Sequence, residues 1–188
     1  AEAGADAVKF QTIVPERLVA STEHARIVQL KRFQLTYDEF TRLARAARGA
    51  GILFLSTPFD TESVAFLDPM VPAFKIASGD CTCMPLLRSI AATGKPIICS
   101  TGHATIEEVV ATRACIRGIW RERGMDPGRA FLHCVGADPG PPSEANLRAI
   151  TTLAQAFPDC VIGYSDHTLG IDAAVAAVAI GARIIEKH

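Results

Sequence analysis

The sequence predicts an α/β fold of the TIM-type (β/α)8 barrel class, here incomplete. Seven short apolar segments each end in a cluster of polar residues and are bounded by Gly or Pro. They alternate with stretches of helical character, so successive strands should run parallel. The segments are VKFQ (8–11), LFLSTPF (53–59), FKIASGD (74–80), IICSTG (97–102), FLHC (131–134), VIGYSDH (161–167) and IIEKH (184–188).

Helices are expected between these strands, and several carry start and stop signals. Thr36 and Thr105 each precede acidic residues, as residues that cap a helix N-terminus often do. Glycines stand where helices should end. The expected helices cover 36–51, 61–68, 83–94, 105–124, 143–157 and 170–182, with stops at Gly51, Gly94 and Gly124.

The helix at 105–124 is the longest of these and should cover the sheet. Its apolar residues lie at spacings compatible with one inward face. They are Ile106, Val109, Val110, Ile116 and Trp120.

The strand count bears on domain organisation. A complete barrel has eight strands in about 250 residues, whereas this chain has seven candidate strands in 188 residues. We therefore expect residues 1–188 to form a single barrel domain that is truncated at both ends, with strands 2 to 8 present and the first strand missing.

Composition excludes several classes of partner. The chain is 49% hydrophobic and 21% charged, with a formal charge of −1. Its Lys and Arg residues are scattered, so we expect neither nucleic acid nor a membrane surface as partner. The longest apolar run, at 173–182, is shorter than the roughly 20 residues that span a bilayer. Six cysteines without a CxxC pair indicate reduced core residues of a cytoplasmic protein.

Polar residues at the strand ends are the candidate functional residues, because the carboxyl ends of all barrel strands share one rim. A mixture of lysines and hydroxyls suits a phosphate or carboxylate. A buried lysine can instead form a Schiff base, so Lys75 also fits an aldolase. The mixture comprises Lys9, Thr57, Lys75, Ser78, Ser100, Thr101, Ser165 and Thr168.

Two histidines at strand ends favour a metal site. His167 and His188 should lie on adjacent strands at the same rim, each beside a carboxylate, Asp166 or Glu186. These carboxylates can serve as further ligands or orient the imidazoles. His133 ends an earlier strand, and we expect it to buttress the loop that follows.

Taken together, these residues resemble the N-acetylneuraminate (sialic acid) synthase family, including its legionaminate and pseudaminate relatives. The resemblance runs nearly end to end, with the motifs in the family's order and spacing. The motifs are ADAVKFQ, LSTPFD, PAFKIASGD, LLRSIAATGKPIICSTG, LHCV, NLRAI, GYSDHTLGI and AAVAIGARIIEKH.

The resemblance implies a reaction and a set of partners. Such synthases condense phosphoenolpyruvate with an N-acylated mannosamine-type sugar, giving a nonulosonic acid and phosphate, and use Mn²⁺ or Mg²⁺. It also implies a homodimer for the full-length protein and a C-terminal antifreeze-like domain, which we expect to lie outside residues 1–188.

The resemblance also implies a role for each matching residue. His167 and His188 would be the metal ligands, Gln11 would face the sugar, Glu186 would transfer a proton, and Asp80 stands where the family has an acid. The residues assigned to phosphoenolpyruvate are Lys9, Thr57, Lys75, Ser78, Ser100 and Ser165.

Two departures from the family pattern lie where the substrates would bind. The segment Gly136-Ala137-Asp138 replaces residues that would contact phosphoenolpyruvate and the sugar, and Asp138 would repel an anion if it pointed inward. His103 replaces a common Met. Two alternatives stay open. The strand-end lysine Lys75 favours a Schiff-base aldolase, whereas the missing strand and the departures at Gly136 to Asp138 favour a degenerate barrel that binds a sugar phosphate without catalysis.

Overall fold

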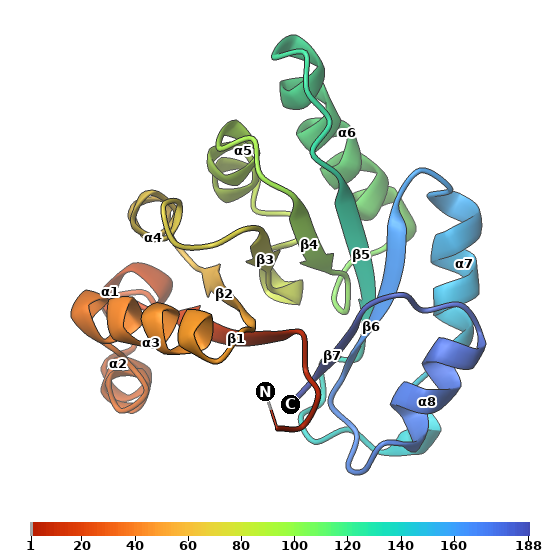
Figure 1. Cartoon of the computed structure of the whole chain (residues 1–188), viewed down its shortest axis with the longest axis horizontal. Coiled ribbons are helices and arrows are strands. Elements are labelled where there is room, and N and C mark those ends of the chain that lie inside the picture. The colour runs from red at the N-terminus through yellow and green to blue at the C-terminus, as the bar shows by residue number, and fades with distance from the viewer. Residues whose placement is uncertain (1) are drawn as a thin grey trace. The chain divides into compact units, whose positions relative to one another are not determined.

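The computed structural model describes residues 2–188 (Figure 1). The chain divides into two compact units, a first that ends at Lys75 and a second from Ile76 to His188. This division does not test the expectation of a single domain over 1–188, which stays a prediction.

The first unit contains a pair of parallel strands with three helices between them. Strands β1 and β2 pair so that Gln11 lies opposite Thr57. The ring of Phe10 packs on Phe54, with centroids 5.7 Å apart, and on the buried Phe40 at 6.5 Å. The elements are β1 (Ala7–Thr12), α1 (Pro15–Leu18), α2 (His24–Lys31), α3 (Tyr37–Gly49), β2 (Leu53–Pro58) and α4 (Thr61–Leu67).

The second unit is built on a parallel sheet. Strand β3 (Phe74–Ile76) begins in the first unit, and the strand order is β3-β4-β5-β6-β7. Helices α5 to α8 lie along the outer side of strands β4 to β7 (Figure 1). The remaining elements are α5 (Met84–Ala92), β4 (Ile97–Ser100), α6 (Ile106–Glu122), β5 (Arg129–Cys134), α7 (Arg148–Ala156), β6 (Val161–Asp166), α8 (Asp172–Ala179) and β7 (Ile185–Lys187).

The alternation of strands and helices agrees with the sequence prediction. All seven expected strands form, and the six expected helices lie within their expected ranges. Helices α1 and α2 were not predicted. Neither begins with a side-chain cap, and α2 buries only Leu30, so the sequence carries little helical signal there.

Capping residues fix the starts of α3 and α6 as predicted. The hydroxyl oxygen of Thr36 accepts a hydrogen bond from the backbone N–H of Glu39, and the Glu39 carboxylate accepts one from the N–H of Thr36. Thr105 and Glu108 form the same reciprocal pair. Each pair satisfies backbone donors that a helix N-terminus leaves without intrahelical partners.

The predicted inward face of α6 was partly wrong. Val109, Ile116 and Trp120 are buried, but Ile106 and Val110 are exposed. Thr112 takes the buried position instead, because residues 109, 112, 116 and 120 follow the helical spacing of three and four. Its hydroxyl donates a hydrogen bond to the carbonyl of Cys81 at 2.6 Å, which satisfies the polar group inside the core.

Two expectations from composition agree with the structure. Within residues 2–188, no helix combines the length and apolar character needed to cross a bilayer. Among the described residues, none of the six cysteines forms a disulfide, and Cys81, Cys99 and Cys134 are buried.

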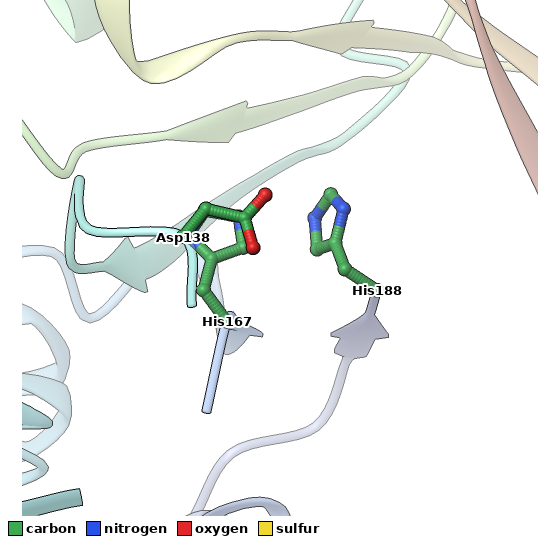
Figure 2. A group of neighbouring side chains, drawn as sticks. All are labelled: Asp138, His167 and His188. Carbon is green, nitrogen blue, oxygen red and sulfur yellow. The ribbon is translucent and has the colours of Figure 1, made fainter. Parts of the chain in front are cut away.

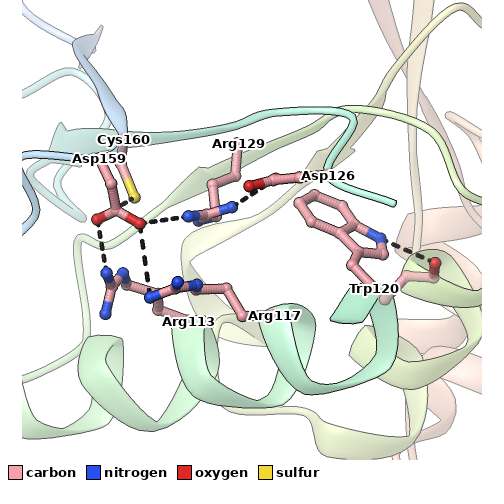
Figure 3. A network of polar contacts seen from close by, with 8 residues as sticks. Arg113, Arg117, Trp120, Asp126, Arg129, Asp159 and Cys160 are labelled. Atoms are coloured by element: carbon pink, nitrogen blue, oxygen red, sulfur yellow. Dashed lines mark hydrogen bonds and ion pairs between the residues drawn. The ribbon is translucent and has the colours of Figure 1, made fainter. Parts of the chain in front are cut away.

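An ion-pair network joins α6, the start of β5 and the turn before β6 (Figure 3). The Arg129 side chain is only 3% exposed; it donates to Asp126 at 2.8 Å and also to Asp159. Asp159 accepts a further hydrogen bond from Arg113 at 2.6 Å. The guanidinium of Arg129 lies 5.8 Å from the centroid of the Trp120 ring. A buried arginine is thus held by two carboxylates and an aromatic face.

This network predicts an acid-sensitive contribution to stability. Burial alone would raise the pKa of Asp159, but hydrogen bonds from Arg113 and Arg129 outweigh it and lower that pKa from 3.8 to about 2. The contribution is therefore fully present above pH 3.8 and is lost as the pH falls through about 2. Because Asp159 is 34% exposed, we expect Asp159→Asn to lower the free energy of unfolding at pH 7 by only about 1–2 kcal/mol in urea titrations.

The matched control is Asp126→Asn, which removes the other carboxylate from the same arginine. Asp126 is 62% exposed, so we expect a loss below about 0.5 kcal/mol. Equal losses from the two variants, or a difference between wild type and Asp159→Asn that persists at pH 2, would contradict the prediction.

Candidate metal and anion site

The side chain of His167 is positioned by the loop that follows β5. Its Nδ1 lies 2.8 Å from the carbonyl oxygen of Val135. Because a carbonyl only accepts hydrogen bonds, Nδ1 carries the proton and Nε2 of the neutral ring keeps its lone pair. The histidine is therefore prepared to bind a cation through Nε2.

His188 lies beside His167, as the sequence predicted for adjacent strand ends. Strand β6 pairs with β7 in parallel, and each histidine directly follows its strand. The ring centroids are 4.3 Å apart. Asp138 joins them: one ligand atom from each of the three residues lies within 4.8 Å of the others (Figure 2).

Asp166 and Glu186, the carboxylates next to the histidines in sequence, have different contacts. Asp166 is fully buried and occupied elsewhere: it accepts hydrogen bonds from the backbone and hydroxyl of Thr168 and from Lys187 at 2.9 Å. It is not the carboxylate grouped with the histidines. Glu186 does contact one of the histidines, since its Oε1 lies 3.5 Å from His188 Nε2.

Further candidate residues of the second unit occupy strand ends. Ser100 and Ser165 are buried at the ends of β4 and β6, and Ser165 is the register partner of Glu186. The Ser78 hydroxyl accepts a hydrogen bond from the N–H of Gly102 at 3.1 Å. Burial raises the pKa of Asp80.

The other four candidates belong to the first unit. Lys9 and Gln11 lie on β1, Thr57 is buried on β2, and Lys75 is buried on β3. Gln11 and Thr57 are register partners at the carboxyl ends of their strands. That these residues share one site with those of the second unit stays a prediction.

His133 has a structural role, as expected. The Nε2 of His133 lies 2.8 Å from the carbonyl of Ala145, so the histidine holds the loop after β5. Burial lowers the pKa of this imidazole and disfavours its charged form. Among residues 2–188, the three-residue group at Asp138 is the one set of potential metal ligands, and it includes neither Cys81 nor Cys83.

The sequence analysis missed Asp138 as a neighbour of the histidines. It also treated His103 as a separate departure, but a Cβ on Gly136 would lie 2.2 Å from the His103 ring. The ring thus occupies the space of the side chain that Gly136 lacks. The position of Asp138 shortly after β5 was the available signal, because residues following a parallel strand gather at the same rim.

These features define a class of protein: a parallel β/α chain that brings together two imidazoles from adjacent strand ends and a carboxylate from the loop after β5. Two nitrogen donors and one oxygen donor suit a divalent first-row metal. The chain belongs to the NeuB family, whose profile matches residues 1–188.

The proteins that this chain resembles are longer than the chain itself. It is 44% identical to the uncharacterized protein MJ1065 of Methanocaldococcus jannaschii, over 98% of this chain and 53% of that protein. It is 36% identical to the N,N'-diacetyllegionaminic acid synthase of Campylobacter jejuni, over 100% of this chain and 59% of the synthase. The chain thus spans between half and three-fifths of these two relatives.

A solved structure shows the same fold. The N-acetylneuraminic acid (sialic acid) synthetase from Leptospira borgpetersenii, in complex with citrate, matches with a TM-score of 0.89 at 35% identity. The match covers 100% of this chain and 63% of the synthetase chain. The predicted fold class, an incomplete TIM-type barrel, is confirmed.

Proposed function

We propose that this chain is the barrel part of an enzyme that condenses phosphoenolpyruvate with an N-acylated, mannosamine-type amino sugar. The products are a nonulosonic acid and phosphate. The observation that carries the proposal is the convergence of His167 and His188 at the ends of adjacent strands, in a member of the NeuB family. The names of the legionaminic acid synthase and sialic acid synthetase relatives support the substrate class.

The two histidines would hold Mn²⁺ or Mg²⁺. When bound, such an ion supplies a Lewis acid that polarises the aldehyde oxygen of the open-chain sugar. The hydrogen bond from His167 to Val135 orients the imidazole for this task.

Phosphoenolpyruvate is an anion, and the remaining strand-end residues suit it. In the second unit, Ser78, Ser100 and Ser165 would donate hydrogen bonds to its phosphate and carboxylate. Lys9, Thr57 and Lys75 of the first unit would add charge and a further donor, and Gln11 would face the sugar. Oriented donors of this kind bind an anion and hold it in a reactive position.

The carboxyl groups would move protons while carbon bonds form. C3 of the enol phosphate bonds to the aldehyde carbon, whose oxygen takes up a proton. Water then adds to C2, losing a proton, and the tetrahedral intermediate expels phosphate. Asp80 suits the acid role because burial raises its pKa, so it keeps its proton at a higher pH than an ordinary aspartate. Glu186, beside His188, suits the transfer of the proton from water.

Phosphate release tests the proposal. The full gene product, expected to be a homodimer, is incubated with phosphoenolpyruvate, Mn²⁺ and N-acetylmannosamine or its 2,4-diacetamido relatives. We expect sugar-dependent release of phosphate that stops when EDTA is added. No release with any of these sugars would reject the proposed reaction. Calorimetry showing binding without turnover would favour the non-catalytic barrel.

Lys75 is buried, which is compatible with the alternative function of a Schiff-base aldolase. A second experiment tests this alternative. A Schiff-base enzyme becomes covalently trapped when borohydride reduces its pyruvate adduct. We expect treatment with pyruvate and borohydride to leave Lys75 without a covalent adduct, as measured by mass spectrometry. The Lys75→Met variant is the control, because nonspecific alkylation of other lysines persists in it. An adduct that disappears in Lys75→Met, with activity insensitive to EDTA, would establish the aldolase instead.

A further inference from the structure

We propose that Asp138 is a third metal ligand, which turns the histidine pair into a two-histidine, one-carboxylate site. This inference rests on the proposed function and adds a donor from the loop after β5. The starting observation is geometric: a carboxylate oxygen of Asp138 and ring nitrogens of His167 and His188 lie within 4.8 Å of one another. Figure 2 shows the carboxylate of Asp138 lying next to the two imidazoles.

The loop that carries Asp138 is fastened to His167 on both sides. Before Asp138, the carbonyl of Val135 accepts the hydrogen bond from His167 Nδ1 at 2.8 Å. After it, the N–H of Gly140 donates to the backbone carbonyl of His167 at 3.0 Å, and Gly140 forms a parallel bridge with Thr168. Asp138 is therefore held between two attachments to the residue whose metal ligation it would share, which lowers the entropy lost on binding.

The surroundings leave the carboxylate available for a cation. Asp138 is exposed, and in the described part of the chain no arginine or lysine pairs with it. Two other acids are nearby: Asp166 is occupied by Lys187 and Thr168, and Glu186 contacts His188, with its Oε1 3.5 Å from His188 Nε2. Asp138 thus places a carboxylate beside the two imidazoles. A carboxylate beside two imidazoles is a donor set that binds divalent first-row cations and leaves coordination positions open.

Metal ligation by Asp138 would change its electrostatic effect on an anionic substrate. An aspartate pointing at an anion site would repel phosphoenolpyruvate. As a metal ligand its charge is offset by the cation, so the anion meets a neutralised group. The feature that looks unfavourable in the sequence becomes compatible with an anionic substrate.

Metal binding without substrate tests the assignment. The full gene product is titrated with Mn²⁺ and the free ion is followed by electron paramagnetic resonance, for wild type, Asp138→Asn and Glu144→Gln. Glu144 is the matched control, because it is another exposed acid of the same loop and lies outside the group. We expect the Mn²⁺ dissociation constant to rise about 10- to 100-fold in Asp138→Asn and to stay unchanged in Glu144→Gln.

A second readout separates ligation from a general charge effect. Co²⁺ bound in place of Mn²⁺ has a visible spectrum that responds to its donors, so Asp138→Asn should change the spectrum and Asp138→Glu should largely restore the affinity. Wild-type affinity and an unchanged spectrum in Asp138→Asn would overturn the assignment while leaving the synthase proposal intact. A wild type that binds neither ion would overturn both.

Discussion

Replacing His167 with alanine should raise the Mn²⁺ dissociation constant by more than about 100-fold and lower metal-dependent phosphate release in proportion. The reason is that Nε2 of His167 is the best-prepared donor in the site: Val135 holds the proton on Nδ1, so the lone pair of Nε2 is fixed in place. Removing it leaves His188 and Asp138, both of them exposed. The measurements are Mn²⁺ titration by electron paramagnetic resonance and a phosphate-release assay on the full gene product.

The control for this prediction is His24→Ala. His24 is an exposed histidine at the start of α2, in the first unit, and should change neither quantity. Circular dichroism of both variants checks that the fold is kept. Wild-type metal affinity in His167→Ala would show that the two-histidine site does not bind the metal, and the proposed chemistry would fall with it.

Most of the fold could be predicted because its signals are local. Apolar runs ended by polar residues mark the strands, and Thr-x-x-Glu pairs mark the starts of α3 and α6. What could not be predicted depends on packing. Thr112 is buried in α6 because Cys81 offers it a hydrogen-bond partner from 31 residues away, and periodicity of apolar residues carries no trace of that partner.

The same distinction applies to the candidate site. The proximity of His167 and His188 follows from parallel pairing of neighbouring strands, so it could be predicted from the two motifs alone. The position of Asp138 after β5 indicates the same rim, but not which residues it approaches there. Its position depends on hydrogen bonds between the loop after β5 and His167, about 30 residues further along the chain. The sequence shows the acid but not the direction in which the loop turns.

Gly163 is a residue whose importance emerges only from packing, and its substitution should have a large effect. It lies on β6, where an added Cβ would stand 2.4 Å from the carbonyl oxygen of Ile184 and 2.5 Å from Leu132 Cδ2. That carbonyl accepts the hydrogen bond from Tyr164 that joins β6 to the chain entering β7. Gly163→Ala must therefore push the two strands apart, at a cost of about 3 kcal/mol in unfolding free energy.

The same displacement should reach the metal site. His167 lies four residues after Gly163, and His188 lies four residues after Ile184, so strands that separate at the glycine carry the histidines with them. We expect Gly163→Ala to weaken Mn²⁺ binding at least about 10-fold in the fraction that remains folded. Gly118→Ala is the control: nothing lies within 4 Å of its Cβ position in α6, and it should stabilise the helix by about 0.5–1 kcal/mol. Unchanged stability and metal affinity in Gly163→Ala would show that the separation of β6 and β7 does not set the geometry of the histidines.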